Sequence, residues 1–212
     1  MISFAKDLSL PDGVDQPRFF SRFSDTQITR GKLPHWEQRS VATFVTFRLA
    51  DSLPQRELDQ LRGEQSEWLA GHPQPWNDDA QREHDELFSA RIEGWLDAGY
   101  GDCILRDPEN RGIVEDRLRY FDGVKYRLYA FVVMPNHVHV VFMPYDDVKV
   151  VDVVRTWKSV SSKMIVKRLA RKGAIWMPEY FDRAIRNGEH FERAVRYTLR
   201  NDERLAWSVF GA

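Results

Sequence analysis

Two histidines separated by one apolar residue are the side chains in this sequence whose types and spacing best suit chemistry. His137 and His139 lie in an apolar stretch at residues 129–144. Side chains two residues apart point to the same face of a β-strand, so both imidazoles share one surface while Val138 and Val140 face the other way. Such a pair either holds a divalent metal ion or consists of polar neighbours on a solvated sheet face.

A tyrosine near the C-terminus is the second candidate for chemistry. Residues 189–204 have helical spacing, and Phe191, Val195 and Leu199 form the predicted buried stripe. Tyr197 lies nearly opposite Val195 on this helix. The same polar stripe carries His190, Arg193, Asn201 and Arg204. A tyrosine outside the predicted core is either an exposed ring resting on arginine side chains or a functional group.

Several sequence blocks, taken together and in order, resemble a known family. Leu-Pro-His-Trp-Glu-Gln at residues 33–38 precedes an apolar segment at 42–50. Met-Pro-Asn-His-Val-His at 134–139 precedes Tyr-Phe-Asp-Arg-Ala-Ile-Arg at 180–186 and the tyrosine segment. This arrangement resembles the REP-associated tyrosine transposases, a branch of the single-tyrosine HUH transposases, where HUH denotes two histidines around a hydrophobic residue.

The resemblance implies a metal-dependent, single-stranded DNA endonuclease and strand transferase that binds REP-type hairpins and forms a 5′-phosphotyrosine intermediate. It implies Tyr197 as the nucleophile, with His137 and His139 as catalytic metal ligands and Asn201 as a third ligand. The family's tyrosine segment usually ends in Asn-Pro, whereas Asp202 follows Asn201 here, so no proline stops the helix. The alternative is a domesticated copy that binds hairpin DNA and cleaves it weakly.

The residue types suit this chemistry. Two neutral imidazoles and an amide oxygen add no negative charge to Mg²⁺ or Mn²⁺, so the cation keeps its charge for polarising the scissile phosphate. Because a tyrosine hydroxyl has an ordinary pKa of about 10, we expect the metal and nearby arginines such as Arg193 to favour its deprotonation. A phosphotyrosine bond retains the phosphodiester energy, so rejoining needs no nucleotide cofactor.

Charge is unevenly distributed along the chain. The formal net charge is −1, but residues 125–212 have a net charge of +7 and residues 1–124 one of −8. Residues 155–172 contain seven basic and no acidic side chains, which predicts a basic amphipathic helix that contacts DNA phosphates. A solvated helix face is the alternative. The predicted apolar stripe of this helix is Trp157, Val160, Met164 and Leu169. The predicted DNA-binding side chains are Arg155, Lys158, Lys163, Lys167, Arg168, Arg171, Lys172 and Arg193, with Trp36 as a base-stacking aromatic.

A sheet and helices must position these side chains. Residues 41–49, 125–134 and 137–143 are predicted strands, and the last two form a hairpin through Pro135 and Asn136. Together with a later strand at 183–186 and the resemblance, they predict an α+β fold, namely a ferredoxin-like split β-α-β antiparallel sheet with packed helices, as in HUH nucleases.

The 212 residues are predicted to form a single domain with an irregular arm at 1–32 and a helical insertion at 51–120. Residues 51–110 carry 15 acidic and 5 basic side chains, with helices predicted at 55–69 and 80–98. This acidic insertion is longer than the resemblance leads us to expect, and no role follows for it from its sequence.

The remaining features narrow the partners and exclude some rival enzymes. No apolar run is long enough to cross a membrane, no signal peptide is evident, and Cys103 is the one cysteine, so we expect a bacterial cytoplasmic, nucleoid-associated protein. Histidine-triad nucleotide hydrolases need a third alternating histidine where Val141 stands. The expected partner is a single-stranded DNA hairpin, without a membrane or nucleotide cofactor, and one nucleophilic tyrosine per chain permits a monomer or a homodimer.

Overall fold

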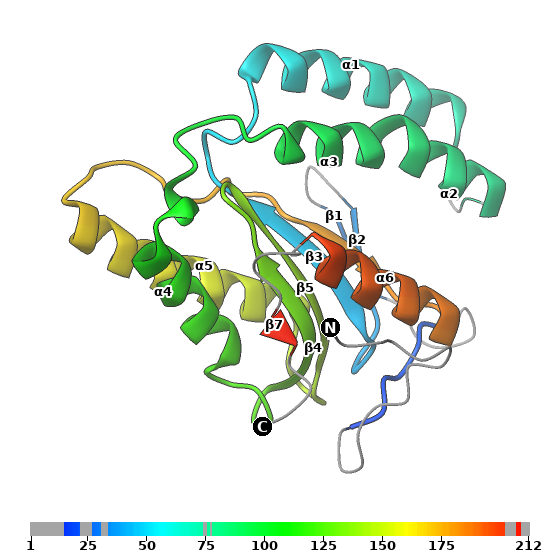
Figure 1. The fold of residues 1–212 in the computed structure, drawn as a ribbon. Helices are drawn as coiled ribbons and strands as arrows, with labels where there is room; N and C mark the ends of the chain where they lie inside the picture. Colours follow the sequence, from blue (N-terminus) through cyan, green and yellow to red (C-terminus); the bar gives the residue numbers. More distant parts are fainter. Residues whose placement is uncertain are drawn as a thin grey trace.

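A five-stranded antiparallel sheet organises the chain (Figure 1). The computed structural model describes residues 15–21, 27–30, 34–73, 76, 78–201 and 207–208. The spatial order is β6, β3, β5, β4, β7. The strands are β3 (Thr43–Arg48), β4 (Tyr126–Val133), β5 (His137–Pro144), β6 (Phe181–Ala184) and β7 (Trp207–Ser208). If β7, a short edge strand, is left out and the other four strands are numbered along the chain, their spatial order is four, one, three, two. This is the strand order of the split β-α-β fold, so the predicted fold class is confirmed.

The helices fall into three groups around this sheet (Figure 1). One group stands above one end of the sheet, a second packs on one sheet face, and a single helix covers the other face. The first contains α1 (Gln55–Gly71), α2 (Asp78–His84), a π-helical segment (Asp85–Ser89) and α3 (Ala90–Asp97). The second contains a 3₁₀ helix (Ile104–Arg106), α4 (Pro108–Arg119) and α5 (Val150–Leu169), and the third is α6 (Gly188–Arg200).

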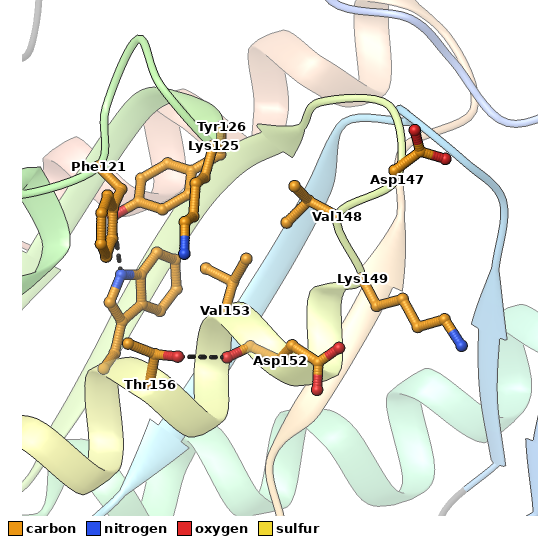
Figure 2. A pocket seen from close by; sticks show the side chains of 10 residues that line it. Phe121, Lys125, Tyr126, Asp147, Val148, Lys149, Asp152, Val153 and Thr156 are labelled. Carbon is orange, nitrogen blue, oxygen red and sulfur yellow. Dashed lines mark hydrogen bonds between the residues drawn. The ribbon is translucent and has the colours of Figure 1, made fainter.

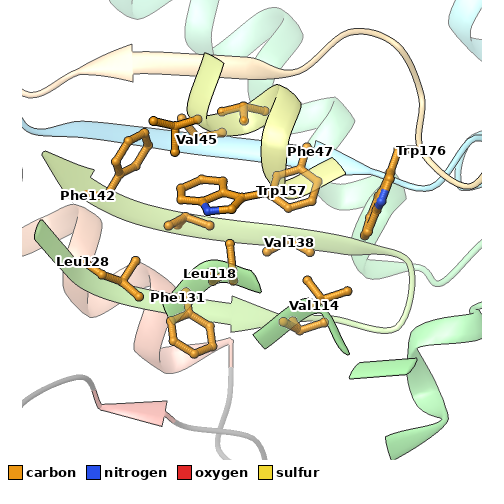
Figure 3. Packing of buried hydrophobic residues seen from close by; sticks show 14 of the residues in the cluster. Val45, Phe47, Val114, Leu118, Leu128, Phe131, Val138, Phe142, Trp157 and Trp176 are labelled. Atoms are coloured by element: carbon orange, nitrogen blue, oxygen red, sulfur yellow. The ribbon is translucent and has the colours of Figure 1, made fainter. Parts of the chain in front are cut away.

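The sheet is apolar on both faces because both are covered. All eight residues of β5 are buried, as expected for a central strand with helices on each side. On one face, Val138 and Phe142 of β5 pack with Phe47 of β3 and Trp157 of α5 (Figure 3). On the other, Val141 of β5 belongs to a second cluster, which includes Phe191, Ala194 and Val195 of α6.

The β4–β5 turn is held from outside the hairpin. The Leu49 N–H donates to the Asn136 carbonyl at 2.8 Å, and the Leu105 N–H donates to the Pro135 carbonyl at 3.2 Å. These bonds satisfy carbonyls that the hairpin itself leaves free. The predicted hairpin is therefore present, and its turn is fixed just before the histidine pair by Leu49, which precedes the insertion, and by Leu105, which lies within it.

Helix α5 confirms the predicted basic helix but corrects its boundaries and its apolar stripe. It begins at Val150, earlier than residue 155, and ends at Leu169, so Arg171 and Lys172 follow the helix. Its buried side chains are Val150, Val153, Val154, Trp157, Ser161 and Ile165. Met164 is 39% exposed, so its inclusion in the predicted stripe is wrong. The spacing admits two adjacent stripes, and packing against β3 and β5 selects the one centred on Trp157.

The acidic segment is helical as predicted. Its first predicted helix, 55–69, corresponds to α1, whereas 80–98 is divided among α2, the π-helical segment and α3. Leu58 of α1 and Leu96 of α3 bury each other together with Leu53, so the two helices lie side by side (Figure 1). Helix α4 behaves differently, because Val114 and Leu118 belong to the sheet's own core.

Part of the predicted irregular arm is regular. β1 (Gln27–Arg30) pairs with β2 (Pro34–Glu37) in an antiparallel ladder, so an arm without regular structure is the wrong description of residues 27–30. Residues 15–21 contain no helix or strand, and the Phe20 N–H donates to the Ile185 carbonyl at 2.8 Å. Residues 1–14 lie outside the described part of the chain.

Within the described residues, none of the helices has the length and apolar character that crossing a membrane requires.

Candidate active site

His137 and His139 lie side by side on the sheet face that α6 covers. Their Nε2 atoms are 3.0 Å apart and their ring centroids 4.6 Å apart. Each residue is 1% exposed. The two-residue period of β5 puts both rings on one face, as the sequence predicts, but the surface is covered rather than solvated. The alternative of polar neighbours on a solvated sheet face is therefore wrong.

The side chain of Asn136 determines the tautomer of His137. Its Nδ2 donates to the Tyr100 carbonyl at 3.0 Å, which fixes the orientation of the amide. Its Oδ1 lies 2.8 Å from His137 Nδ1, and because Oδ1 can only accept, Nδ1 must carry the proton. His137 Nε2 is consequently unprotonated: without a metal it can accept a hydrogen bond from His139 Nε2, 3.0 Å away, and its lone pair is the one that metal-binding histidines with a carbonyl partner use for a cation.

Thr46 and Phe44 position His139 from the neighbouring strand β3. The Thr46 hydroxyl lies 2.7 Å from His139 Nδ1, and a hydroxyl can donate or accept. The ring of Phe44 stacks on the imidazole with centroids 5.4 Å apart and an interplanar angle of 20°. When the Thr46 hydroxyl accepts a hydrogen bond from Nδ1–H, the Nε2 lone pair of His139 is available to a cation without any movement of the ring.

Burial keeps both imidazoles neutral. It lowers the pKa of His137 to about 4. Burial, with the charge of His137 as a second cause, lowers the pKa of His139 well below its usual value. The 4.0 Å approach of Asp97 Oδ1 to His137 Nε2 is therefore not an ion pair at neutral pH. Neutral imidazole is the form that binds metals.

The pair fits one divalent cation but is not a complete site. Two ligand atoms at right angles, each about 2.1 Å from an octahedral ion, stand about 3.0 Å apart, and the two Nε2 atoms are 3.0 Å apart. With both Nδ1 atoms protonated, the Nε2 lone pairs would face each other, which is unfavourable unless a cation lies between them. Among the described residues, no group of three or more histidine, cysteine, aspartate or glutamate side chains stands ready to hold a metal without a side-chain rearrangement.

Tyr197 packs over the histidine pair. Its ring lies edge-on to His139, with centroids 5.2 Å apart at 71°, and edge-on to Phe44 at 5.9 Å. The hydroxyl oxygen is buried and has no partner of hydrogen-bond geometry within the described part of the chain. The alternative of an exposed tyrosine is wrong, because the close packing of α6 on the sheet turns this half-buried ring toward β5.

The charges around Tyr197 differ from the prediction. Burial raises the pKa of the Tyr197 hydroxyl, the charges of Glu93 and Asp97 on α3 raise it further, and the Asn201 amide lowers it. Arg193 is paired with Glu189 through an exposed contact of 2.7 Å and is not among the causes of this shift. The main charges that act on the Tyr197 hydroxyl are therefore acidic side chains of the insertion, and a role of arginines in its deprotonation stays a prediction.

Asn201 lies at the C-cap of α6, one turn beyond the tyrosine. Its N–H donates to the Tyr197 carbonyl at 3.3 Å, and α6 ends at Arg200 without the proline that is usual in the family. Its Nδ2 is buried and has no partner of hydrogen-bond geometry among the described residues. Its role as a third metal ligand stays a prediction.

The basic helix α5 lies on the opposite sheet face from α6 (Figure 1), and Tyr197 of α6 packs on His139. Arg168 contacts Asp107 at 2.9 Å and Glu109 at 2.5 Å, both on the α4 side. Arg171 contacts Asp102 at 3.3 Å, and Arg155 contacts Asp152 at 3.0 Å. The three arginines are therefore compensated by carboxylates from outside residues 155–172, although that segment contains no acidic side chain.

The lysines of this region differ in accessibility. Lys158 is half-buried; it donates to the Pro178 carbonyl at 2.7 Å, and burial lowers its pKa to about 8. Lys163, Lys167 and Lys172 are exposed and remain the best candidates of this group for phosphate contact, which stays a prediction. The side chain of Trp36 lies outside the part of the structure that is described, so its predicted stacking role is untested.

Two hollows also lie on the α5 face rather than at the histidines. One of about 220 Å³ is lined by Phe121, Lys125, Lys149 and Trp157, among others (Figure 2). Another, of about 380 Å³, lies between α5 and residues 174–180. Neither includes the histidine pair or Tyr197, so the candidate chemistry does not depend on them.

Sequence reasoning missed four side chains that shape the site. Asn136 and Thr46 hold the imidazoles, while Glu93 and Asp97 bring negative charge to them and to Tyr197. Asn136 had a usable signal, since it directly precedes His137 in the turn. Glu93 and Asp97 had no such signal in the sequence, because their approach to the site depends on how the insertion folds back over the sheet.

Comparison with known proteins identifies the class of the segment that carries this geometry. Residues 115–199 match the family model described as "Transposase IS200 like". This segment contains β4, β5, α5 and α6, and with them His137, His139 and Tyr197. This segment is thus similar to the IS200-like transposases, which confirms the predicted resemblance over residues 115–199.

Two further comparisons add little. No sequence among the curated proteins matches this chain. One solved structure, described as "Structure of the REP associates tyrosine transposase bound to a REP hairpin", aligns over 81% of this chain and 72% of its own, with a TM-score of 0.43 and 14% identity. Similarity at that level assigns neither activity nor partner.

Proposed function

We propose that the protein is a metal-dependent, single-stranded DNA endonuclease and strand transferase of the REP-associated type. One observation carries the proposal: the ring of Tyr197 lies 5.2 Å from that of His139, whose Nε2 is 3.0 Å from that of His137. A nucleophile and a pair of neutral metal-binding groups are thereby assembled within one chain, on the segment that matches the IS200-like transposases.

Each side chain has a distinct role in this proposal. His137 and His139 hold Mg²⁺ or Mn²⁺ through Nε2, and Asn201 supplies a third, amide ligand. When bound, the cation polarises the scissile phosphate and offsets its negative charge. Asn136 and Thr46 keep the Nδ1 atoms occupied, so the Nε2 lone pairs stay available.

Tyr197 performs the covalent step. Its hydroxyl oxygen attacks the phosphorus, a bond forms between that oxygen and the 5′-phosphate, and the bond to the 3′-oxygen breaks. The proton of the hydroxyl leaves, and the departing strand takes up a proton as a 3′-hydroxyl. Attack by another 3′-hydroxyl reverses these changes and joins the strands, so no ATP is consumed.

The substrate is proposed to be a REP-type hairpin with an adjacent single-stranded segment. The sequence resemblance supports this choice, and the excess of basic residues in 125–212 supports a polyanionic partner. Because Tyr197 faces the histidines of its own chain, we propose that a monomer is sufficient for one cleavage. The proposed location is the bacterial cytoplasm, at the nucleoid.

A binding protein that cleaves weakly is the second candidate, and a specific observation favours it. Burial and two carboxylates raise the pKa of Tyr197, so its hydroxyl is a poor nucleophile unless a cation reaches the site. Such a protein would bind hairpins and release them uncut. The two candidates differ in the covalent product rather than in affinity.

The test is to incubate labelled single-stranded REP hairpins with the full chain and Mn²⁺ or Mg²⁺, then resolve the mixtures on native and denaturing gels. Tyr197→Phe should bind the hairpin like the wild type and form no adduct. Tyr120→Phe is the matched control, because Tyr120 is 62% exposed at the end of α4. An adduct that survives in Tyr197→Phe would refute the assignment of the nucleophile. Hairpin binding without any adduct would favour the second candidate.

A further inference from the structure

The end of α3 brings a carboxylate to the histidine pair. Asp97 is the last residue of α3, and its Oδ1 lies 4.0 Å from His137 Nε2. Glu93, one turn earlier, is close enough to raise the pKa of Tyr197. The tip of the acidic insertion therefore faces both parts of the candidate active site.

The position of Asp97 is electrostatically unfavourable without a cation. A negative side chain at a helix C-terminus opposes the helix dipole, and the last turn of α3 contains no basic residue. Its 4.0 Å neighbour His137 is buried, with 1% of its side chain exposed. Among the described residues, no lysine or arginine forms an ion pair with Asp97. A divalent cation beside the carboxylate would supply the positive charge that the helix end and its surroundings lack.

We propose that Asp97 is a further ligand of the divalent cation held by His137 and His139. The inference rests on the proposed function and adds a carboxylate from the insertion to its metal site. Opposite ligands of an octahedral ion at about 2.1 Å are about 4.2 Å apart, so the 4.0 Å between Oδ1 and Nε2 lies within one coordination sphere. The Asp97 side chain is 49% exposed, which leaves it free to rotate toward the ion.

The ligand assignment explains why a negative group stands where a phosphodiester must approach. Without a cation, Asp97 and Glu93 would repel the DNA backbone, and the insertion would inhibit cleavage. As a ligand, Asp97 instead strengthens cation binding and adds a hard oxygen to two imidazoles, a change that favours Mg²⁺ and Mn²⁺ over softer metals. The two explanations predict opposite effects of removing the carboxylate.

The first experiment measures Mn²⁺ binding to the metal-free full chain by electron paramagnetic resonance of the free ion. Asp97→Ala should raise the dissociation constant about tenfold or more, and Asp97→Asn should have a smaller effect because one oxygen remains. Glu86→Gln is the matched control, since it removes an equal charge from an exposed position in the same insertion. It should bind Mn²⁺ like the wild type.

A second measurement separates coordination from folding. Asp97→Cys replaces the carboxylate by a thiolate, which prefers softer ions. Its affinity for Cd²⁺ relative to Mn²⁺ should rise at least about tenfold over the wild type, a change that a purely structural role would not produce. Unaltered relative affinities would overturn the ligand assignment.

The outcomes distinguish failure of the inference from failure of the proposed function. If His137→Ala abolishes Mn²⁺ binding and Asp97→Ala leaves it unchanged, Asp97 is no ligand, although the histidine site stands. If Asp97→Ala instead cleaves faster, the insertion is inhibitory and the inference is wrong. If His137→Ala binds Mn²⁺ like the wild type, the metal site of the proposed function itself is refuted.

Discussion

The basic helix α5 and the acidic insertion differ in a way that their charges alone do not reveal. α5 carries the densest positive charge in the sequence, yet it lies across the sheet from the histidines, and Arg155, Arg168 and Arg171 are in ion pairs. The insertion carries the densest negative charge, yet Glu93 and Asp97 reach the candidate active site. Residues 51–107 thus contribute carboxylates both to the site and to the neutralisation of α5.

This contrast shows that the charge of a segment predicts the kind of partner it binds but not where the segment lies in the fold. Asp102 and Asp107 follow the insertion helices and compensate Arg171 and Arg168. Exposed pairs of this kind contribute little to stability, but they change which basic side chains are free for DNA. Lys163 and Lys167 are exposed and become better candidates than the arginines beside them.

Loss of a histidine should have the largest effect and should be confined to the α6 face. His139→Ala should slow formation of the covalent adduct by about 10²–10³-fold, because it removes one of the cation's two imidazoles. Lys167→Ala, on α5, should leave the rate with saturating hairpin nearly unchanged. Quantifying adduct against time on denaturing gels checks both. Equal losses of rate in the two variants would show that the α6 face and the α5 face do not differ in their contribution to cleavage.

The buried histidine should make the same face sensitive to acid. Burial lowers the pKa of His137 from 6.5 to about 4, so below pH 6.5 the unfolded chain binds the proton more readily than the folded chain. Stability should therefore fall as the pH drops, by about 3 kcal/mol from this residue between pH 7 and pH 4. Urea unfolding with a chelator at each pH, for the wild type and His137→Gln, measures the difference. Parallel pH profiles would contradict it.

Removing a carboxylate from the insertion should have a smaller effect, on the tyrosine. Glu93 raises the pKa of Tyr197, so Glu93→Gln should lower that pKa and move the pH dependence of adduct formation to lower pH. Glu86→Gln provides the comparison, as an exposed acidic residue of the same segment. An unchanged pH profile in Glu93→Gln would show that this carboxylate of the insertion does not influence the pKa of Tyr197.

The smallest effects are expected on α5 itself, where neighbouring residues should behave differently. Replacing Lys163 and Lys167 by alanine should reduce the slope of log affinity against log salt by about one to two if both contact phosphates. Arg168→Ala should change the salt slope less, because Arg168 already contacts Asp107 and Glu109, and it should lower the melting temperature only slightly. Identical salt slopes for the wild type and the double-lysine variant would remove α5 from the DNA path.

The sequence by itself determined the parts that depend on local periodicity. The alternation around Val138 and Val140 and the two-residue spacing of His137 and His139 placed β5 and gave both rings one face. The segment order predicted the split β-α-β topology, and the tyrosine segment formed the predicted helix α6. These features follow from backbone geometry within a few residues, which a sequence displays directly.

Only the tertiary structure decided which surfaces meet. The helical period of α6 put Tyr197 away from Val195, but packing on the sheet turned its ring toward His139. The period of α5 left two possible stripes, and contact with β3 and β5 selected the one centred on Trp157. The approach of Asp97 to His137 joins residues forty positions apart through the fold of the insertion. Local spacing cannot encode such contacts, because they depend on how whole elements are oriented and on the burial that results.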